Sequence, residues 1–261
     1  MRVALGVEYS GWKYAGFQRQ NHVPAVQNEL ERALSIIADA PVELKCAGRT
    51  DAGVSATGQV VHFDVEKFRP ERAWQLGTNT HLPDDIVVTW AKHVPDEFHA
   101  RFSAKARRYR YILQTGDFRP GILRQGVSVY RGNFDVAAME AAGQIMLGEN
   151  DFASFKSAQD ENPHSMRNLH FLKVMQRGRY IIFDIEANAF LHHMVRNIVG
   201  SLLLVGSGER DGAWFKHVFE AKNREIAGPT AFPEGLYLVH VTYDDKWELP
   251  IRPEDMGPLW L

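Results

Sequence analysis

The order of predicted strands and helices repeats once along the chain, and this repetition limits the fold more than any other feature. Apolar alternation and helical stripes predict strand, helix, two strands, helix and strand in the first hundred residues. These segments are 2–10, 24–38, 41–47, 57–65, 70–79 and 85–92. The order β-α-β-β-α-β is that of a ferredoxin-like unit.

A second set of elements in the same order begins at Arg107. It consists of strand 107–114, a helix from Asp135 with Gly148 as its end cap, strands 169–176 and 180–187, helices 191–206 and 212–222, and strand 236–243. The two halves share no residue-level repeat, so the duplication is inferred from topology. We expect an α/β (α+β) fold of two tandem ferredoxin-like halves, 1–105 and 106–261, with a joined, mixed, mainly antiparallel sheet and a central cleft.

Composition places the chain among soluble globular proteins. Of its 261 residues 45% are hydrophobic, the mean hydropathy is −0.29, and no apolar run approaches the ~20 residues that span a bilayer. The first residues lack the apolar core of a signal peptide, so we expect a cytoplasmic protein without membrane contact. The single cysteine, Cys46, excludes an internal disulfide and a cysteine-built metal cluster, and is interpreted as a small strand residue.

A net charge of −2 does not by itself indicate a polyanionic partner, but the charges are unevenly distributed. The stretch HARFSAKARRYRY, residues 99–111, contains five cations and no acid: Arg101, Lys105, Arg107, Arg108 and Arg110. A basic segment with interleaved aromatics is typical of surfaces that bind phosphates and bases. A solvated charged strand is the alternative interpretation.

Three short segments contain candidate functional residues. In GRTDAGV, residues 48–54, Asp51 is either an Asx-turn or helix cap, or a carboxylate that a substrate can approach, with Arg49 beside it to contact a phosphate or displace a base. In RRYRYIL, strand alternation places Tyr109 and Tyr111 on one face and Arg108 and Arg110 on the other. Each tyrosine either packs in the core or stacks on a nucleobase.

The third segment is NAFLHHMVRNIVG, in the predicted helix 191–206. Arg196 lies off its apolar stripe, where it is either a surface residue or the partner of a half-buried carboxylate. His192 and His193 are adjacent and diverge on a helix, and without an HExxH pattern we predict no metal site. The loop SGWKYAGFQRQ, residues 10–20, either lies over the cleft or packs its rings against the core. No phosphate loop, GxSxG elbow or dinucleotide fingerprint is present, so no nucleotide cofactor is expected.

Together these segments resemble the bacterial tRNA pseudouridine synthase A family. The resemblance covers nearly the whole chain, from Val3 to about Tyr243 and on into MGPLWL. It rests on FQRQ, CAGRTDAGVSATGQVVHF, FHARFSAKARRYRYIL, LGENDFASF, RN at 167–168, ANAFLHHMVRNIVGSLL and EGLYLVHV, in this order. One departure is visible, because Ser55 stands where the family's GRTDAGVHA run has histidine.

The resemblance implies an isomerase that converts uridine to pseudouridine at positions 38, 39 and 40 of the tRNA anticodon arm, as a homodimer and without metal or organic cofactor. By the same resemblance Asp51 corresponds to the nucleophile, Tyr109 to the tyrosine that stacks on the uracil, and Arg196 to the arginine that pairs with the nucleophile. Arg49 matches the residue associated with base flipping, and Leu236 the apolar wall beneath the ring. Two alternatives remain: a non-catalytic RNA-binding protein, and a hydrolase or glycosylase that releases free base.

Overall fold

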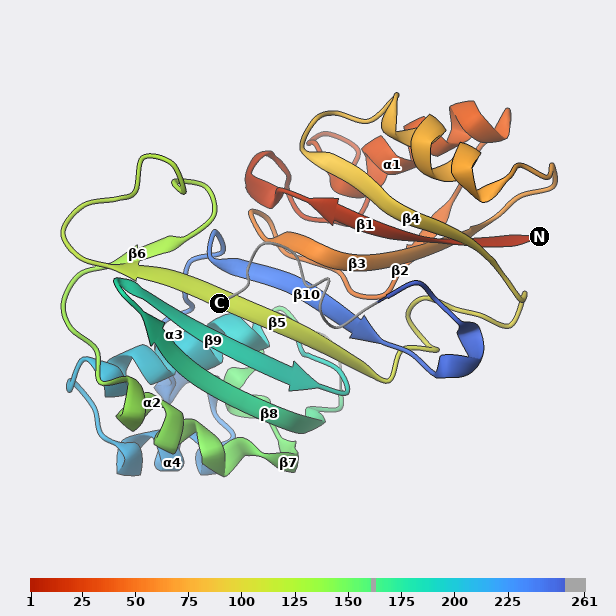
Figure 1. Ribbon diagram of the computed structural model, residues 1–261. Coiled ribbons are helices and arrows are strands. Elements are labelled where there is room, and N and C mark those ends of the chain that lie inside the picture. The colour runs from red at the N-terminus through yellow and green to blue at the C-terminus, as the bar shows by residue number, and fades with distance from the viewer. Residues whose placement is uncertain (161–162, 252–261) are drawn as a thin grey trace. The chain divides into compact units, whose positions relative to one another are not determined.

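The chain forms two compact units in the computed structural model, which describes residues 1–160 and 163–251 (Figure 1). The first unit contains residues 1–106 and the C-terminal segment from Tyr237, and the second contains residues 107–236. Each unit combines a sheet with helices, so the predicted α+β class is confirmed. In the described residues no helix has both the length and the apolar character needed to cross a membrane.

The sheet of the first unit is centred on two long strands. β1 (Arg2–Tyr9) lies between β3 (Ser55–Asp64) and β4 (Ile86–Val94) and is antiparallel to both. Two short pairings share the outer edge of β3. There β2 (Leu44–Cys46) pairs in antiparallel register, and the beginning of β10 (Leu236–Thr242) pairs in parallel register. The order β4-β1-β3-β2 is that of a ferredoxin-like half.

The helices of this unit cover one face of its sheet (Figure 1). In α1 (Val26–Ala38), the predicted apolar stripe is buried. The second helical segment contains the π-helical turn Ala73–Gly77, and its buried Trp74 packs edge-on against Phe63 of β3 with ring centroids 5.2 Å apart. Strand alternation places the neighbouring His62 on the opposite face, where its ring meets Phe98.

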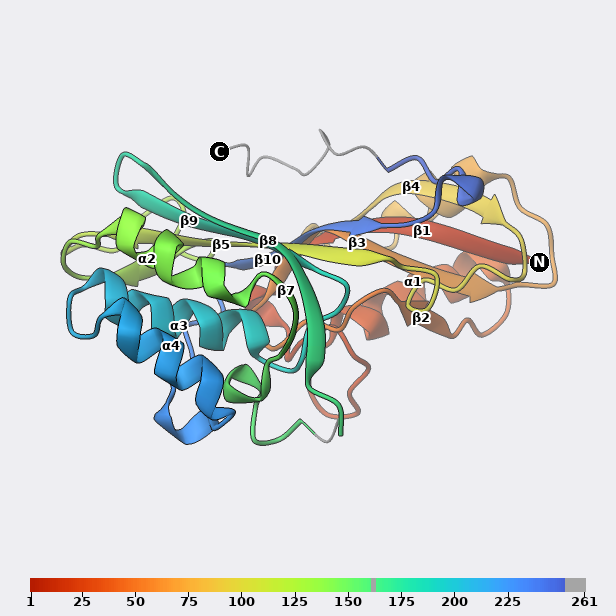
Figure 2. The same cartoon turned by 90° about the horizontal axis from the view of Figure 1, so that it is seen from below.

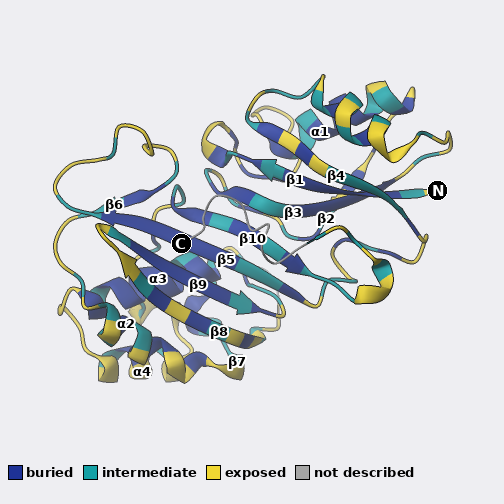
Figure 3. Ribbon diagram, viewed as in Figure 1, coloured by how far each residue is buried: buried dark blue, intermediate teal, exposed yellow. Residues whose placement is uncertain are grey.

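The second unit has the strand order β5-β9-β8-β7. The strands are β5 (Ala106–Thr115), β9 (Tyr180–Ala187), β8 (Met166–Arg177) and β7 (Gly148–Asp151), all paired antiparallel, while β6 (Ser128–Tyr130) pairs in parallel with β5. Three helices, α2 (Val136–Gly143), α3 (Met194–Gly206) and α4 (Gly212–Ala221), pack together on one face of this sheet (Figure 2). Both β5 and β9 are largely buried (Figure 3).

Short helical turns connect these elements. They are Gly11–Lys13, Gln144–Met146, Ala153–Phe155, Arg224–Ile226 and Asp245–Trp247.

The structure differs from the sequence prediction at several boundaries. Helix α3 begins at Met194 instead of 191, because His193 adopts a left-handed conformation with φ 60°. Helix α2 ends at Gly143, and Gly148, with φ 86°, begins β7 instead of capping that helix. The final strand, expected within 106–261, belongs from Tyr237 onward to the first unit, since it pairs there with β3.

Candidate active site

Asp51 lies in the turn between β2 and β3, in the first unit. The residue is half-buried, and Arg49 on the same turn is exposed. The Asp51 carbonyl accepts a hydrogen bond from the N–H of Val54 at 3.1 Å, which closes the turn. Gly53 within it has φ 79°, a conformation that glycine adopts without strain. The chain therefore turns sharply at the aspartate.

Neighbouring segments hold this turn on both sides of Asp51. Thr50 is buried, and its Oγ1 lies 2.8 Å from the hydroxyl of Tyr9. The Thr50 carbonyl accepts a hydrogen bond from the N–H of Phe17 at 3.0 Å, and the N–H of Gly53 donates to the carbonyl of Tyr14 at 3.3 Å. These bonds fix the main chain that presents the Asp51 carboxylate.

Two further buried side chains brace the ends of the turn. The Gln59 side chain, fully buried on β3, donates from Nε2 to the carbonyl of Gly48 at 2.6 Å. Ser55 Oγ accepts a hydrogen bond from the N–H of Gly11 at 3.0 Å. A Cβ at Gly11 would lie 2.1 Å from the carbonyl oxygen of Val54, so only glycine permits this approach. The beginning of loop 10–20 therefore packs directly against the turn of Asp51.

Tyr109 lies on β5 in the second unit and is 8% exposed. Its ring meets that of Phe190 edge-on, with centroids 5.0 Å apart and planes at 84°. Phe190 occurs in the NAFLHH segment, but nothing in its spacing indicated contact with a strand 80 residues earlier, so the sequence prediction missed it.

Tyr111, on the same face of β5, is a core residue. It is fully buried, and its hydroxyl donates to Ser128 Oγ at 2.8 Å. Burial raises the pKa of this hydroxyl well above its usual range, while the nearby Arg196 cation partly opposes the shift. Of the two tyrosines in RRYRY, Tyr111 thus follows the core interpretation.

The arginines Arg108 and Arg110, on the opposite face of β5, pair with a buried aspartate. Asp184 of β9 is almost fully buried and accepts two hydrogen bonds of 2.7 Å from Arg108 and a third of 3.1 Å from Arg110. The guanidinium of Arg108 also lies 4.7 Å from the centroid of Phe171. The sequence analysis did not anticipate this pairing, because Asp184 lies on the adjacent strand and more than 70 residues away in the sequence.

Arg196 lies in the first turn of α3 and is half-buried. Its Nε donates to the carbonyl of Ala231 at 2.8 Å, and its own carbonyl accepts the Ala231 N–H at 3.1 Å. The adjacent Asn197 is fully buried, and its Oδ1 accepts hydrogen bonds from Arg224 at 3.1 Å and Thr230 at 2.7 Å. The loop 224–231 thereby holds Arg196, a function that its sequence did not indicate.

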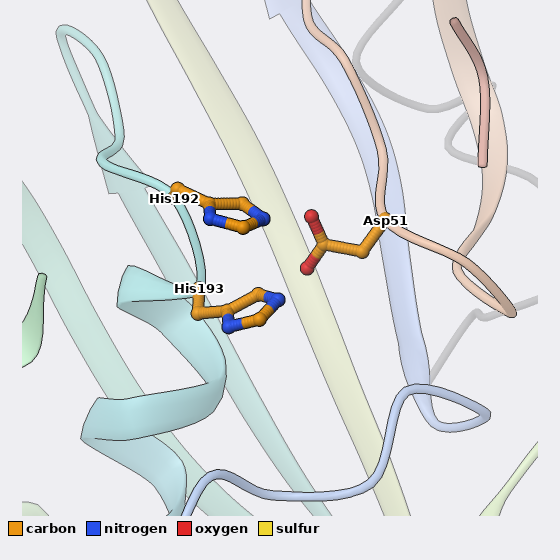
Figure 4. Close-up of side chains that lie close together, drawn as sticks. All are labelled: Asp51, His192 and His193. Carbon is orange, nitrogen blue, oxygen red and sulfur yellow. The ribbon is translucent and has the colours of Figure 1, made fainter. Parts of the chain in front are cut away.

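The two histidines that precede α3 lie side by side. The rings of His192 and His193 have centroids 3.9 Å apart, and Figure 4 shows both rings together with Asp51 on its own turn. Among the described residues of the second unit, no further His, Cys, Asp or Glu completes a set of three with this pair.

Leu236 is the first residue of β10 and is 5% exposed. Its N–H donates to the carbonyl of Pro233 at 2.9 Å, and the preceding Gly235 accepts the N–H of Ile112 at 2.8 Å. The five predicted site residues are thus divided between the units. Asp51 and Arg49 share one turn of the first, and Tyr109, Arg196 and Leu236 belong to the second.

Comparison with protein families identifies the class of protein. The model of the tRNA pseudouridine synthase family matches residues 6–103 and 142–244, which include the turn of Asp51 and the first turn of α3. The chain belongs to this family, whose members are isomerases acting on tRNA.

Individual relatives are similar over the whole chain and are named tRNA pseudouridine synthase A. The relative from Actinobacillus succinogenes is 56% identical over 100% of this chain and 98% of its own length. That from Vibrio vulnificus strain YJ016 is 58% identical with the same coverage, and that from Haemophilus influenzae strain Rd is 57% identical over 100% of this chain and 96% of its own.

Proposed function

We propose that the chain isomerises uridine to pseudouridine at positions 38, 39 and 40 of the tRNA anticodon arm. The observation that carries this proposal is the turn of Asp51, in which hydrogen bonds from three neighbouring segments hold the main chain beside a half-buried carboxylate. A reaction on a base extruded from an RNA stem needs an acid held in place before the substrate arrives.

The reaction breaks the bond between N1 of uracil and C1′ of ribose, and joins C5 of the same base to C1′. The C5 proton leaves to solvent, and N1 gains a proton, so atoms and charge balance. A carboxylate suits this exchange because it can attack C1′ or stabilise positive charge there while the base rotates. We assign this function to Asp51, with no metal or organic cofactor.

The other site residues would retain and orient the base. Arg196, whose Nε is held by Ala231, would pair with Asp51 and keep it ionised. Tyr109 would stack on the uracil, and Leu236 would form an apolar wall beneath the ring. The edge-on contact with Phe190 supports this assignment, because it fixes the plane of the Tyr109 ring.

The RNA must also be bound and locally opened. Extruding a nucleotide costs a few kcal/mol, and stacking on an aromatic ring contributes about 1–3 kcal/mol per base. Arg49, exposed on the turn, would enter the space the base leaves, and the exposed Arg101 would contact phosphates. Arg108 and Arg110 are assigned no contact with RNA, since Asp184 binds them.

We further propose that the enzyme acts as a cytoplasmic homodimer. In this assignment half 1–105 supplies Asp51, and half 106–261 completes the active site and forms the subunit contact. Sedimentation of the purified protein should give the mass of two chains.

Tritium release tests the activity directly. A tRNA transcript carrying uracil labelled at C5 should lose tritium to water with the wild-type protein, and the modified positions should map to 38–40. Asp51→Ala should release none while binding tRNA within about threefold of wild type, because the substitution removes a reacting group and no phosphate contact. Asp84→Ala, at an exposed aspartate of the same unit, is the matched control and should release tritium normally.

Two outcomes would contradict the proposal. Tight tRNA binding without tritium release by the wild type would favour a non-catalytic RNA-binding protein. Free uracil in the supernatant would favour a glycosylase that uses Asp51 but loses the base.

A further inference from the structure

We propose that Tyr9 is a positioning residue for Asp51, and that its hydroxyl acts through the side chain of Thr50. The inference rests on the proposed function of Asp51. It assigns a function to a buried tyrosine that neither the sequence motifs nor the reaction itself uses.

The geometry links the two residues directly. Tyr9 ends β1 and is 3% exposed, and its hydroxyl lies 2.8 Å from Oγ1 of Thr50, which is 7% exposed. Because the Tyr9 hydroxyl and Thr50 Oγ1 are both buried, a bulk water molecule cannot take the place of either group when the other is removed. Thr50 immediately precedes Asp51, so its side-chain bond fixes the peptide that leads into the aspartate.

Among the hydrogen bonds that hold the turn, the one from Tyr9 reaches the side chain of the residue that precedes Asp51. Residues 47–54 belong to no helix or strand, so side chains and neighbouring loops must satisfy their polar groups. The Thr50 carbonyl accepts the N–H of Phe17, and the bond to Tyr9 holds the side chain of the same residue. Loss of the Tyr9 hydroxyl would therefore loosen the turn at the residue next to the nucleophile.

The ring of Tyr9 is held separately from its hydroxyl. It packs against Phe17 with ring centroids 5.8 Å apart, and that contact persists in phenylalanine. Tyr9→Phe therefore removes the hydroxyl that bonds Thr50 and keeps the ring that packs against Phe17. A displacement of the reacting group by about 1 Å can cost 100-fold in rate, whereas one lost hydrogen bond has a modest effect on folding.

Tyr14 provides a matched control in the same unit. It is 7% exposed, and its hydroxyl donates to Asp85 at 2.7 Å, away from the turn. The carbonyl of Tyr14 accepts the N–H of Gly53 in the turn, and Tyr14→Phe leaves that carbonyl in place. Each Tyr→Phe variant removes one hydrogen-bonded hydroxyl, at Thr50 in Tyr9→Phe and at Asp85 in Tyr14→Phe.

The experiment compares kcat and KM for tRNA with melting temperature in five variants: Tyr9→Phe, Thr50→Val, Thr50→Ser, the double variant Tyr9→Phe/Thr50→Val, and Tyr14→Phe. We expect Tyr9→Phe and Thr50→Val to lower kcat at least about 10-fold with KM within about threefold. The double variant should be no slower than the slower single one, because both remove the same bond. Thr50→Ser, which restores a hydroxyl, should recover most of the rate lost in Thr50→Val.

The control separates positioning from stability. Tyr14→Phe should lower the melting temperature as much as Tyr9→Phe and leave kcat within about twofold. Wild-type kcat in Tyr9→Phe, equal kcat losses in the two tyrosine variants, or multiplying losses in the double variant would each overturn the inference. If Asp51→Ala turned over normally, the proposed function itself would fail, whatever the tyrosine variants did.

Discussion

The turn of Asp51 and the centre of the β5–β9 sheet both contain an aspartate, and the two are held in different ways. At Asp184 the carboxylate itself joins the structure, because it accepts hydrogen bonds from Arg108 and Arg110 across two strands. At Asp51 the structure is held through the main chain of the turn and the side chains of Thr50 and Gln59. We therefore expect substitution of Asp184 to affect mainly the fold, and substitution of Asp51 to affect mainly the proposed reaction.

The largest effect expected from this comparison is on turnover in Asp51→Asn. The variant keeps the size of the side chain and removes its charge, so tritium release should fall at least about 1,000-fold. The free energy of unfolding in urea should stay within about 1 kcal/mol of wild type, since the turn keeps its main-chain bonds. A large loss of stability with retained activity would reverse the assignment of the two aspartates.

The substitution Asp184→Asn should lower the free energy of unfolding and largely preserve turnover, the reverse of Asp51→Asn. Asp184→Asn leaves two largely buried guanidinium groups without their counter-charge, and breaking a buried pair costs about 3–5 kcal/mol. The folded fraction should retain turnover within a few-fold at low temperature. Asp64→Asn, whose pair with Arg2 is largely exposed on the acid side, should cost under about 1 kcal/mol in the same urea titration.

The buried imidazole of His62, in the first unit, is expected to make the free energy of unfolding depend on pH. His62 accepts the N–H of Ala100 at Nδ1, and its pKa is lowered to about 4, first because burial disfavours the charged ring and second because His99 lies beside it. The unfolded chain therefore binds a proton here more readily than the folded one, and protonation favours unfolding as the pH falls below about 6.5. From pH 7.5 to pH 5 the loss should be about 2 kcal/mol.

Substitution of His62 measures its contribution to the pH dependence of the free energy of unfolding. His62→Gln should flatten the fall in unfolding free energy between pH 7.5 and 5, whereas His22→Gln, at an exposed loop position, should leave it unchanged. Identical pH profiles for wild type and His62→Gln would show that other groups cause the loss.

The last prediction concerns Ser55, at the end of the turn, where only a modest loss of stability is expected. Ser55→Ala removes the acceptor of the buried Gly11 N–H and should lower the free energy of unfolding by about 1–2 kcal/mol. Ser55→Thr, which keeps the oxygen, should be milder by thermal melting. Equal losses in both variants would indicate that the space around Ser55, not the hydrogen bond, limits substitution.

Local sequence determined much of this protein. Apolar alternation predicted β1, β3, β5 and β9, and the periodic stripe of α1 is buried as expected, because each pattern needs only the chain's own geometry. Family resemblance supplied the class of enzyme, which the family comparison confirmed.

Only the tertiary structure decided which side chains form hydrogen bonds and ion pairs with each other. No local pattern indicated that Asp184 would pair with the arginines of β5, that Tyr9 would reach Thr50, or that loop 224–231 would hold Arg196. It also decided that β10 would pair with β3, some 180 residues earlier. Hydrogen bonds and ion pairs between distant segments depend on which segments come into contact after folding. The local sequence gives the donors, acceptors and charges of each segment, but not the segment that it will contact.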